Sequence, residues 1–543
     1  MKICLAQLNT QLWSVEKNTQ KIKDVISTHG KDVDVIAFSE MTITGYPLND
    51  MLDDDDLVKK QKEVIYEIKQ LVAETNKNLK VILGFIDYNP DEKLPSGEMK
   101  KYNAAAVIGE DIQIYHKRLL PNYDVFFEMR YFAPGTEWLT FAIREDLKWA
   151  MTICEDIWDD DYAVKPIKAY KDQNVDVVFN ISSSPFTKEK LKTRFNLLNR
   201  HAQDIWAHMV YVNQVGGQDE LVFDGASMVV GPEGTLQHMS KRFEEDVTIF
   251  DTEEKHTDKT QEVLDEYKNN YYHMLEAIKL CLKDYMAKTG LKDVVIGVSG
   301  GIDSALDLYI LSQVVPVEHI HAIYMPTQYN SDESLSLSQK LCDNAGVKLQ
   351  VGAIEELVKS FEKFGVEKLG KKPEWVSHEN IQARIRAIIL MNIANDVRGL
   401  VINNTNKTEY AMGYGTLYGD LIGGISLIGD LIKTEVYGMA KFVNDQHGYD
   451  IIPSRIIDRK ASAELAPGQF DPFNYERESA AIEELQFGKS LPEVAKKYNL
   501  SLDEVKEMRR KIKINEFKIK QGTVVVKLKK KSVGVGRLYP VVE

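Results

Sequence analysis

Short apolar runs separated by polar helical stretches fill the first 250 residues of the chain. Such runs are typical of buried strands, and they read VDVIAFSE, KVILGFI, NAAAVIG, KWAMTICED, VDVVFNIS, MVYVNQVG and ASMVVG. Charged segments with helical periodicity, such as LVKKQKEVIYEIKQLVAET, lie between some of them. Three runs end in a polar residue, namely Glu40, Cys154 and Asn180. Since ligands of α/β sheets bind at the carboxyl ends of strands, these positions are the first candidates for a site.

A second α/β pattern begins after residues 252–275, which are charged and poor in strand-forming residues. Its order of strand, glycine turn, helix and strand is that of a doubly wound fold, and it runs through DVVIGVSGGIDSALDLYILSQ, HIHAIYMP, VKLQVGAI and GLVINNTN. From about residue 476 the chain is helical and basic, and it ends in KLKKKSVGVGRLYP. We therefore predict two α/β domains, at 1–255 and 276–543, joined by a linker at 256–275.

Composition narrows the class of protein. The chain has 543 residues, of which 44% are hydrophobic and 28% charged, as in folded proteins. Its net charge of −14 makes it a poor general binder of nucleic acid, and no uncharged apolar run is long enough to cross a bilayer. The four cysteines are scattered without a CxxC pair, which favours a reducing compartment. The start, MKICLAQLNT, is typical of a strand rather than a signal peptide, so we expect a cytoplasmic protein without nucleic-acid or membrane partners.

The strongest motif of the second half is the hexapeptide SGGIDS, which joins the apolar run VVIGV to the helical ALDLYILSQ. Glycines let the backbone approach an anion, and free amides at a helix start favour negative charge. A plain glycine turn is the alternative, but the strand–turn–helix setting favours a phosphate site. The residues expected to line it are Ser299, Gly300, Gly301, Ile302, Asp303 and Ser304.

Other phosphate-binding motifs fail in this sequence. Gly488-Lys489-Ser490 has the tail of a Walker A motif, but Glu483 stands where its first glycine is required. Gly534-Val535-Gly536 lacks the third glycine of the dinucleotide fingerprint, because Tyr539 occupies that position. The loop at 299–304 is therefore the phosphate site that the sequence predicts.

The hexapeptide resembles the pyrophosphate loop of the N-type ATP pyrophosphatases, which cleave ATP to AMP and pyrophosphate and activate a substrate oxygen as an adenylate. Four more stretches are similar to the NAD synthetase branch of that family, namely ENIQARIR at 379–386, NNTNKTEYAMGYGTLYGD at 403–420, GDLIKTEVY at 429–437 and SAEL at 462–465. The resemblance implies a doubly wound, mostly parallel α/β domain that binds ATP.

The same resemblance implies roles for single residues. Asp303 and Glu409 would hold Mg²⁺, Lys433 would neutralise charge on the phosphates, and Thr405 would contact the nucleotide. A capping or surface role is the alternative for each of them. The residues expected around the dinucleotide substrate, deamido-NAD, are Asn380, Arg384, Tyr414, Thr416, Asp420 and Lys518. The first two of these are also candidates to reach the substrate from a neighbouring subunit.

Three segments of the first half combine into possible chemistry, although each is weak alone. They are Phe38-Ser39-Glu40, Tyr115-His116-Lys117 and Ile153-Cys154-Glu155-Asp156. A lone cysteine is usually a buried apolar residue, and a thiol is a good nucleophile only as a thiolate. A carboxylate base can generate the thiolate, and a lysine can donate to the oxyanion that forms when an amide is attacked. Glu40, Lys117 and Cys154 would supply base, oxyanion donor and nucleophile.

In this order, the three segments resemble the nitrilase family of carbon–nitrogen hydrolases. The resemblance implies an α-β-β-α sandwich with Glu40, Lys117 and Cys154 as catalytic residues. The segment 180–186 matches the family stretch that holds glutamine. The residues expected to bind glutamine are Tyr123, Glu128, Ser183, Pro185 and Lys190. The loop at 214–219, which reads QVGGQD, also matches the family but has no assigned role.

Joined in one chain, the two halves resemble the family of glutamine-dependent NAD synthetases (EC 6.3.5.1). The resemblance implies that ammonia released from glutamine amidates deamido-NAD that ATP has activated, giving NAD, AMP, pyrophosphate and glutamate. It implies Mg²⁺ with ATP as the cofactor, no prosthetic group, and a homo-oligomer, often an octamer in the family. GMP synthetase and asparagine synthetase are alternatives, but their glutaminase parts lack the Glu/Lys/Cys pattern. A regulatory protein with dead sites is the other alternative, and its signature would be the loss of Cys154 or Asp303.

Overall fold

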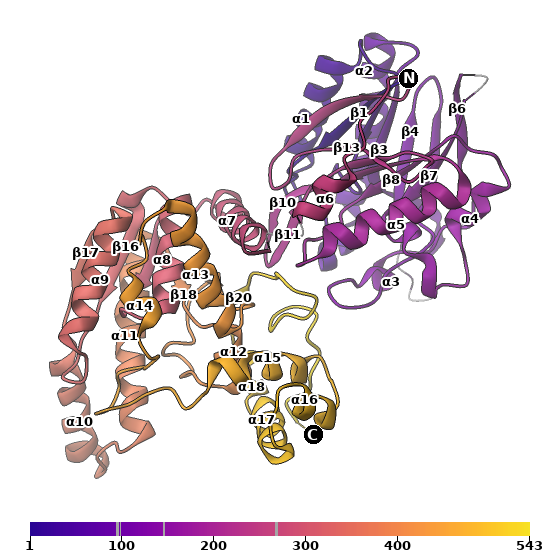
Figure 1. Cartoon of the computed structure of the whole chain (residues 1–543). Coiled ribbons are helices and arrows are strands. Elements are labelled where there is room, and N and C mark those ends of the chain that lie inside the picture. Colours follow the sequence, from indigo (N-terminus) through magenta and orange to yellow (C-terminus); the bar gives the residue numbers. More distant parts are fainter. Residues whose placement is uncertain (94–96, 98, 145–146, 267–269, 543) are drawn as a thin grey trace. The chain divides into compact units, whose positions relative to one another are not determined.

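The computed structural model describes residues 1–93, 97, 99–144, 147–266 and 270–542. These residues form two compact units (Figure 1). The first unit comprises Met1–Gly216 and Val222–Asn270, and the second comprises Gly217–Leu221 and Tyr271–Glu543.

The linker expected at 256–275 is partly helical. It contains helix α6 (Thr260–Glu266) and the first residues of α7 (Asn270–Thr289), and its residues 267–269 lie outside the described part of the chain.

The first unit is built on two six-stranded sheets. The strands of one sheet, in spatial order, are β14 (Asp246–Asp251), β1 (Lys2–Gln7), β2 (Val35–Phe38), β3 (Lys80–Lys93), β4 (Met99–Ile108) and β5 (Ile112–His116). Those of the other are β13 (Leu236–Met239), β12 (Met228–Val230), β9 (His208–Asn213), β8 (Val177–Ser182), β7 (Leu147–Ile153) and β6 (Thr140–Arg144). A separate pair comprises β10 (Val215–Gln218) and β11 (Leu221–Asp224).

The two sheets face each other across a hydrophobic core. Leu5 and Ala37 of one sheet belong to the same buried cluster as Trp149 and Phe179 of the other. The outer face of the second sheet packs against α5, for example through Phe195. The helices of this unit are α1 (Val15–His29), α2 (Asp55–Thr75), α3 (Glu128–Tyr131), α4 (Pro166–Lys171), α5 (Lys190–Ile205) and α6.

Helix α2 packs against β3, where Gln61 accepts a hydrogen bond from the backbone amide of Ile86. The α-β-β-α sandwich is thus confirmed. Central strands covered on both faces are buried at every position and mostly hydrophobic, which is why runs such as VVFNIS could be recognised.

The second unit contains one parallel sheet. Its strands, in spatial order, are β17 (Leu349–Val351), β16 (Ile320–Tyr324), β15 (Val294–Gly297), β18 (Leu400–Asn403), β19 (Ile425–Ser426) and β20 (Val524–Val525). Every described pair in it is parallel. In chain order this is 3-2-1-4-5-6, the doubly wound arrangement that the sequence predicted. Ligands of such sheets bind where the strand order reverses, which here is between β15 and β18.

Helix α7 precedes the first of these strands, and the other helices of the second unit lie between strands. In chain order, the helices of this unit are α7, α8 (Ile302–Val314), α9 (Asp332–Ala345), α10 (Glu355–Leu369), α11 (Val376–Val397), α12 (Lys407–Met412), α13 (Lys433–His447), α14 (Ser454–Asp458), α15 (Tyr475–Gln486), α16 (Leu491–Lys497), α17 (Leu502–Ile514) and α18 (Glu516–Ile519). The helical end expected from residue 476 stops at Ile519, and the following segment returns to the sheet as β20. Within the described residues, no helix is long and apolar enough to cross a bilayer.

Candidate active sites

A buried cluster of charged side chains lies at the strand ends of the first unit. Glu40 follows β2 and Lys117 follows β5. The ammonium nitrogen of Lys117 lies 2.8 Å from Glu40 Oε1 and 2.7 Å from Glu128 Oε1. Asn103 donates to Glu40 Oε1 at 2.7 Å, and the backbone amide of Ser183 donates to Glu40 Oε2 at 2.8 Å. The carboxylate of Glu40 is therefore held at a fixed position between the two sheets.

Cys154 stands at the end of β7, at the start of a 3₁₀ turn over Cys154–Ile157. Its backbone is left-handed, with φ of +42°, a conformation that non-glycine residues adopt mostly where surrounding structure enforces it. Asp156 provides that enforcement, because its carboxylate accepts hydrogen bonds from the amides of Ile153 and Leu119 and from Tyr115 Oη. One buried carboxylate thus ties the turn that carries the thiol to the segment after Lys117.

The electrostatics of this cluster keep the thiol protonated at rest. Burial raises the pKa of Cys154 well above its usual value, the charge of Glu40 raises it further, and Lys117 opposes both. Burial also raises the pKa of Glu128, to about 7, although Lys117 opposes the shift. Burial lowers the pKa of Lys117, but Glu128 and Glu40 raise it more, so the lysine stays cationic. The structure therefore brings the three expected catalytic side chains into one electrostatic unit.

The residues expected to bind glutamine surround this cluster. Ser183 donates its hydroxyl to the backbone oxygen of Glu40, and Pro185 is buried two residues further on. The Tyr123 hydroxyl donates to Glu155 at 3.0 Å. The ammonium group of Lys190, at the start of α5, lies 4.0 Å from the ring centroid of Trp158.

Two charges of opposite sign flank the thiol. Burial and the nearby charge of Arg194 lower the pKa of Lys190 to about 8, and the charge of Glu155 counteracts that shift. Glu155 is buried, accepts hydrogen bonds from Tyr123 and Tyr162, and has a pKa raised by its burial. A carboxylate and an ammonium group on either side of a nucleophile match the charges of an α-amino acid.

Glu155, Asp156 and Asn103 were not predicted as site residues. For Asn103 a signal existed, because it is the polar position in the apolar run NAAAVIG of β4. Glu155 and Asp156 follow the thiol directly in the sequence, but only the turn geometry shows that one carboxylate faces the cluster and the other fastens it.

In the second unit, the loop after β15 forms a compact turn. Gly300 has φ of +76°, and a Cβ there would lie 2.6 Å from the backbone oxygen of Ser334, so only glycine fits. The hydroxyl of Ser304 accepts from the amide of Ser299, and the hydroxyl of Ser299 accepts from the amide of Gly301, each at 3.2 Å. Ile302 begins α8, so the free amides at the N-terminus of this helix directly follow the loop.

Three charged side chains converge beside this loop. Lys433 Nζ lies 2.5 Å from Asp303 Oδ2 and 3.0 Å from Glu409 Oε1. Asn406 donates to Asp303 at 2.9 Å, and its backbone amide donates to Glu409 at the start of α12. Burial raises the pKa of Glu409 to about 8, whereas Lys433 opposes that shift. Loop, carboxylates and ammonium group thus meet where the resemblance implies the phosphates of ATP.

Asn404 and Thr405 lie at the carboxyl end of β18, next to β15. Asn404 donates to the backbone oxygen of Gly297 at 2.9 Å, while its buried Oδ1 has no hydrogen-bond partner. Thr405 is buried, and its amide donates to Asn403 Oδ1. Asn404 was not predicted, and its unpaired oxygen marks the point where the strand order reverses.

The residues expected around deamido-NAD gather on the loop 413–421. Thr416 donates its hydroxyl to Asn380 Oδ1 at 2.7 Å and its amide to Asp420 at 2.7 Å. Arg384 donates to the backbone oxygen of Leu417, and Lys518 donates to the backbone oxygens of Gly413 and Gly415. Tyr414 lies on the same loop, but its hydroxyl donates to Asp471 at 3.2 Å.

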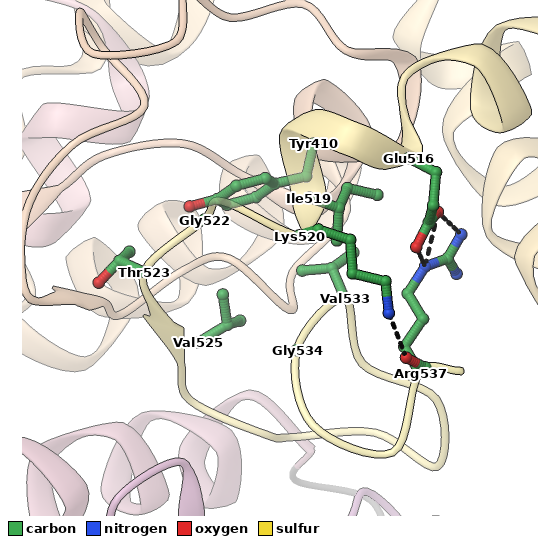
Figure 2. A pocket seen from close by; sticks show the side chains of 10 residues that line it. All are labelled: Tyr410, Glu516, Ile519, Lys520, Gly522, Thr523, Val525, Val533, Gly534 and Arg537. Carbon is green, nitrogen blue, oxygen red and sulfur yellow. Dashed lines mark hydrogen bonds and ion pairs between the residues drawn. The ribbon is translucent and has the colours of Figure 1, made fainter. Parts of the chain in front are cut away.

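A cavity of about 190 Å³ lies elsewhere in the second unit (Figure 2). It is lined by Tyr410 and the C-terminal segment, and Arg537 forms a buried ion pair with Glu516 there. None of its lining residues is a predicted site residue. Its volume is below the roughly 300–1,000 Å³ of ordinary ligand pockets.

Comparison with known proteins assigns a family to each half. A model of the carbon–nitrogen hydrolases matches residues 2–260. A model described as NAD synthase matches residues 274–522.

Whole proteins with both halves are also similar. The glutamine-dependent NAD(+) synthetase of Acinetobacter baylyi is 32% identical over 100% of this chain and 98% of its own, and that of Thermotoga maritima is 33% identical with the same coverage. The structure of the glutamine-dependent NAD+ synthetase from Acinetobacter baumannii, in complex with ADP, has a TM-score of 0.76 at 30% identity, covering 100% of this chain and 98% of that one. A glutamine-dependent NAD(+) synthetase from Cytophaga hutchinsonii shares the fold, with a TM-score of 0.82 at 20% identity and the same coverage.

Proposed function

The chain belongs to the family of glutamine-dependent NAD(+) synthetases, and we propose that its two units divide the reaction between a glutaminase site around Cys154 and an adenylating site around Asp303. It is a ligase that takes the amide nitrogen of NAD from glutamine. The observation that carries the division of labour is the burial of Glu40, Lys117 and Cys154 together in one unit, while the phosphate loop lies in the other.

In the glutaminase site, Glu40 takes the proton of Cys154 as the sulfur attacks the side-chain amide of glutamine. Glu40 Oε2 accepts a hydrogen bond from the amide of Ser183, and its second lone pair can take the proton. Lys117 donates to the oxyanion of the tetrahedral intermediate, Glu40 returns its proton to the amide nitrogen, and that nitrogen leaves as ammonia while the thioester forms. Water then hydrolyses the thioester to glutamate and restores the thiol.

Glutamine is held by charge complementarity. Lys190 pairs with its α-carboxylate and Glu155 with its α-ammonium group, while Tyr123 orients Glu155. Ser183 and Pro185 shape the wall next to Glu40, and Glu128 fixes Lys117. The amide carbon is thereby directed at Cys154.

In the adenylating site, the nicotinate carboxylate of deamido-NAD attacks the α-phosphate of ATP, and pyrophosphate leaves into the loop 299–304. Lys433 neutralises the charge that develops on the phosphates, and Thr405 and Asn404 contact the nucleotide at the end of β18. Ammonia then displaces AMP and completes the amide of NAD. The ADP bound in the Acinetobacter baumannii relative supports an adenine-nucleotide site here.

Asp303 and Glu409 fit a Mg²⁺ ion that ATP brings with it. Among the described residues, no group of three or more His, Cys, Asp or Glu side chains is arranged to hold a metal by itself. Two hard carboxylates beside a phosphate loop nevertheless suit Mg²⁺, which takes its remaining ligands from phosphates and water. Asp303 and Glu409 would hold the ion, and it would supply positive charge that lowers the repulsion between the attacking carboxylate and the phosphates.

The chain is proposed to work as a homo-oligomer in the cytoplasm. Trp375, Val376 and Ile388 are 85%, 64% and 68% exposed around α11, the helix that carries Asn380 and Arg384. Such exposed apolar side chains mark interaction surfaces, which supports delivery of these two residues to a neighbouring subunit's deamido-NAD. All four cysteines are free thiols, which supports a reducing compartment. The octamers implied by the resemblance remain a prediction.

Product analysis tests the proposed function. The purified chain, given deamido-NAD, ATP, Mg²⁺ and either glutamine or ammonia, should form NAD and AMP in equal amounts. XMP and aspartate, the acceptors of the alternative enzymes, should give none. ADP in place of AMP, or amidation of XMP, would contradict the proposal.

A further inference from the structure

The C-terminal segment 524–531 is an integral part of the second unit. Its first two residues extend the sheet as β20, and the amide of Val526 donates to the backbone oxygen of Ser426. The next residues are fastened by one carboxylate, because Asp430 Oδ2 accepts from the amides of Leu528 and Lys529, each at 2.8 Å. The segment that reads KLKKK in the sequence is therefore anchored at the base of α13 rather than free at the surface.

Lys529 belongs to a buried group of five charged side chains, which we call the tail cluster. Its ammonium group pairs with Glu435 and lies 2.8 Å from Glu483 Oε1. Lys407 Nζ lies 2.7 Å from the same oxygen of Glu483 and 2.9 Å from Asp430 Oδ1. The tail cluster thus joins α12, α13, α15 and the segment after β20.

The tail cluster is poor in solvent and pairs charges of opposite sign. The side chains of Lys529, Glu435 and Glu483 are 7%, 12% and 17% exposed, and those of Lys407 and Asp430 are almost fully buried. Burial pushes the pKa of Glu483 up, but Lys407 and Lys529 pull it below its usual value. Two ammonium groups face three carboxylates, so the loss of one lysine would leave buried carboxylates that repel one another.

The tail cluster also contacts the starts of α12 and α13, the helices that carry Glu409 and Lys433. Glu435 accepts a hydrogen bond from the amide of Ile432 and so closes the first turn of α13, which begins with Lys433. Lys407 is the first residue of α12, whose third residue is Glu409, and its amide donates to the backbone oxygen of Leu431. Lys529 is connected to Lys433 through Glu435, which lies two residues further along α13. It is connected to Glu409 through Glu483 and Lys407, which lies two residues before Glu409 on α12.

We propose that Lys529 is a positioning residue for adenylation, which acts by holding Glu435 and Glu483 so that Lys433 and Glu409 keep their places beside the phosphate loop. The proposal rests on the proposed function of this site. Lys529 does not act by contact with substrate, because its side chain is enclosed by the tail cluster. A displacement of about 1 Å at the reacting groups is enough to cost roughly a hundred-fold in rate.

The test compares Lys529→Met with Lys530→Met, a matched variant of the exposed neighbouring lysine. Ammonia-driven NAD formation is measured with the full chain as kcat and KM for ATP and deamido-NAD, with glutamine hydrolysis and thermal unfolding followed in parallel. We expect Lys529→Met to lower kcat by at least about ten-fold while each KM changes less than about three-fold. Lys530→Met should match the unmodified chain, and Lys529→Arg should restore most of kcat because a cation returns to the cluster.

A folded Lys529→Met variant with unchanged kcat would overturn the inference, as would a fall in kcat that Lys529→Arg does not relieve. If Lys529→Met fails to fold, Lys529→Met/Glu483→Met takes its place, because it keeps the net charge of the tail cluster at −1 and should fold with the same loss of kcat. A folded double variant with the unmodified kcat would again overturn the inference. Absence of NAD formation by the unmodified chain would instead refute the proposed function.

Discussion

The ammonium group of Lys117 lies 2.8 Å from a carboxylate oxygen of Glu40, and neither side chain is more than 1% exposed. Because this pair is already neutralised, Lys117 does little to stabilise a thiolate at Cys154, whose pKa stands well above its usual value through burial and the charge of Glu40. The nucleophile therefore rests as a thiol, and in the proposed mechanism its proton moves to Glu40 as the sulfur attacks glutamine. This order protects a buried sulfur from oxidation between turnovers, since thiolates are the forms that oxidants attack.

Removal of the thiol should separate the two activities. Cys154→Ala is expected to abolish glutamine-driven NAD formation and to leave ammonia-driven formation within about two-fold of the unmodified rate, because no residue of the adenylating site is changed. Both rates are measured on the same preparation. Cys342→Ala, which replaces a buried cysteine on α9, is the control and should keep both activities. Joint loss of the two activities in Cys154→Ala would refute the separation.

Lys190 should set the alkaline limit of glutamine binding. Its pKa is lowered to about 8, so the cation that pairs with the α-carboxylate is lost as the pH rises through that value. We expect KM for glutamine to rise above about pH 8 in the unmodified chain. Lys190→Met should raise KM by about ten- to a hundred-fold and remove this pH dependence, since a charged hydrogen bond contributes about 1.5–3 kcal/mol.

Initial-rate measurements between pH 6.5 and 9.5, roughly bracketing that pKa, check this expectation. Lys168→Met on the exposed face of α4 is the control. A KM that stays flat across pH in the unmodified chain would exclude Lys190 as the carboxylate partner.

Asp303 should matter for ATP and not for glutamine. Asp303→Asn removes the charge that faces Lys433 and one of the two carboxylates that fit Mg²⁺. We expect ammonia-driven NAD formation to fall by about 10²–10³-fold, with more Mg²⁺ needed for half-maximal rate. Glutamine hydrolysis should survive, and both rates are recorded on the same preparation. Equal loss of hydrolysis and amidation would contradict this assignment.

Asp307 should destabilise the fold, and increasingly so at higher pH. It is fully buried on α8, both of its carboxylate oxygens lack a hydrogen-bond partner, and burial raises its pKa well above the usual value. The folded chain therefore keeps a proton that the unfolded chain releases above about pH 4, so unfolding becomes easier as the pH rises from there.

Asp307→Ala is expected to raise the free energy of unfolding by about 1–3 kcal/mol near neutral pH. Its advantage should shrink toward pH 4, where both states of the unmodified chain are protonated. Denaturant unfolding at several pH values provides the measurement, with exposed Asp445→Ala on α13 as the control. A variant that is less stable than the unmodified chain at neutral pH would show that the carboxyl group has a partner.

Much of the fold could be predicted because its central strands are mostly hydrophobic. The runs that became β8 and β15 are covered on both faces, so their sequences contain few polar residues to obscure them. Strands β14 and β20 were missed for opposite reasons. The first is half-buried at a sheet edge and contains polar residues, and the second is only two residues long and lies next to a basic segment.

The site residues also divide into those that the sequence predicted and those that it could not predict. The sequence indicated Glu40, Lys117 and Cys154 because each lies within two residues of the end of a strand. It indicated the loop 299–304 because the glycines of that loop lie between a strand and a helix. Lys529 could not be predicted, since a run of lysines near a chain end is normally a solvated surface. Its burial depends on three carboxylates that come from segments far away in the sequence, and no local pattern records them.

Transfer of labelled nitrogen from glutamine to NAD shows whether the two sites act in one reaction. The purified chain is supplied with deamido-NAD, Mg²⁺, ATP and glutamine labelled with ¹⁵N in its side-chain amide, and NAD, AMP and glutamate are quantified with the isotope content of the NAD amide. We expect ¹⁵N in the carboxamide of NAD, with one AMP for each NAD formed. NAD without ¹⁵N, or ATP consumed to ADP, would contradict it.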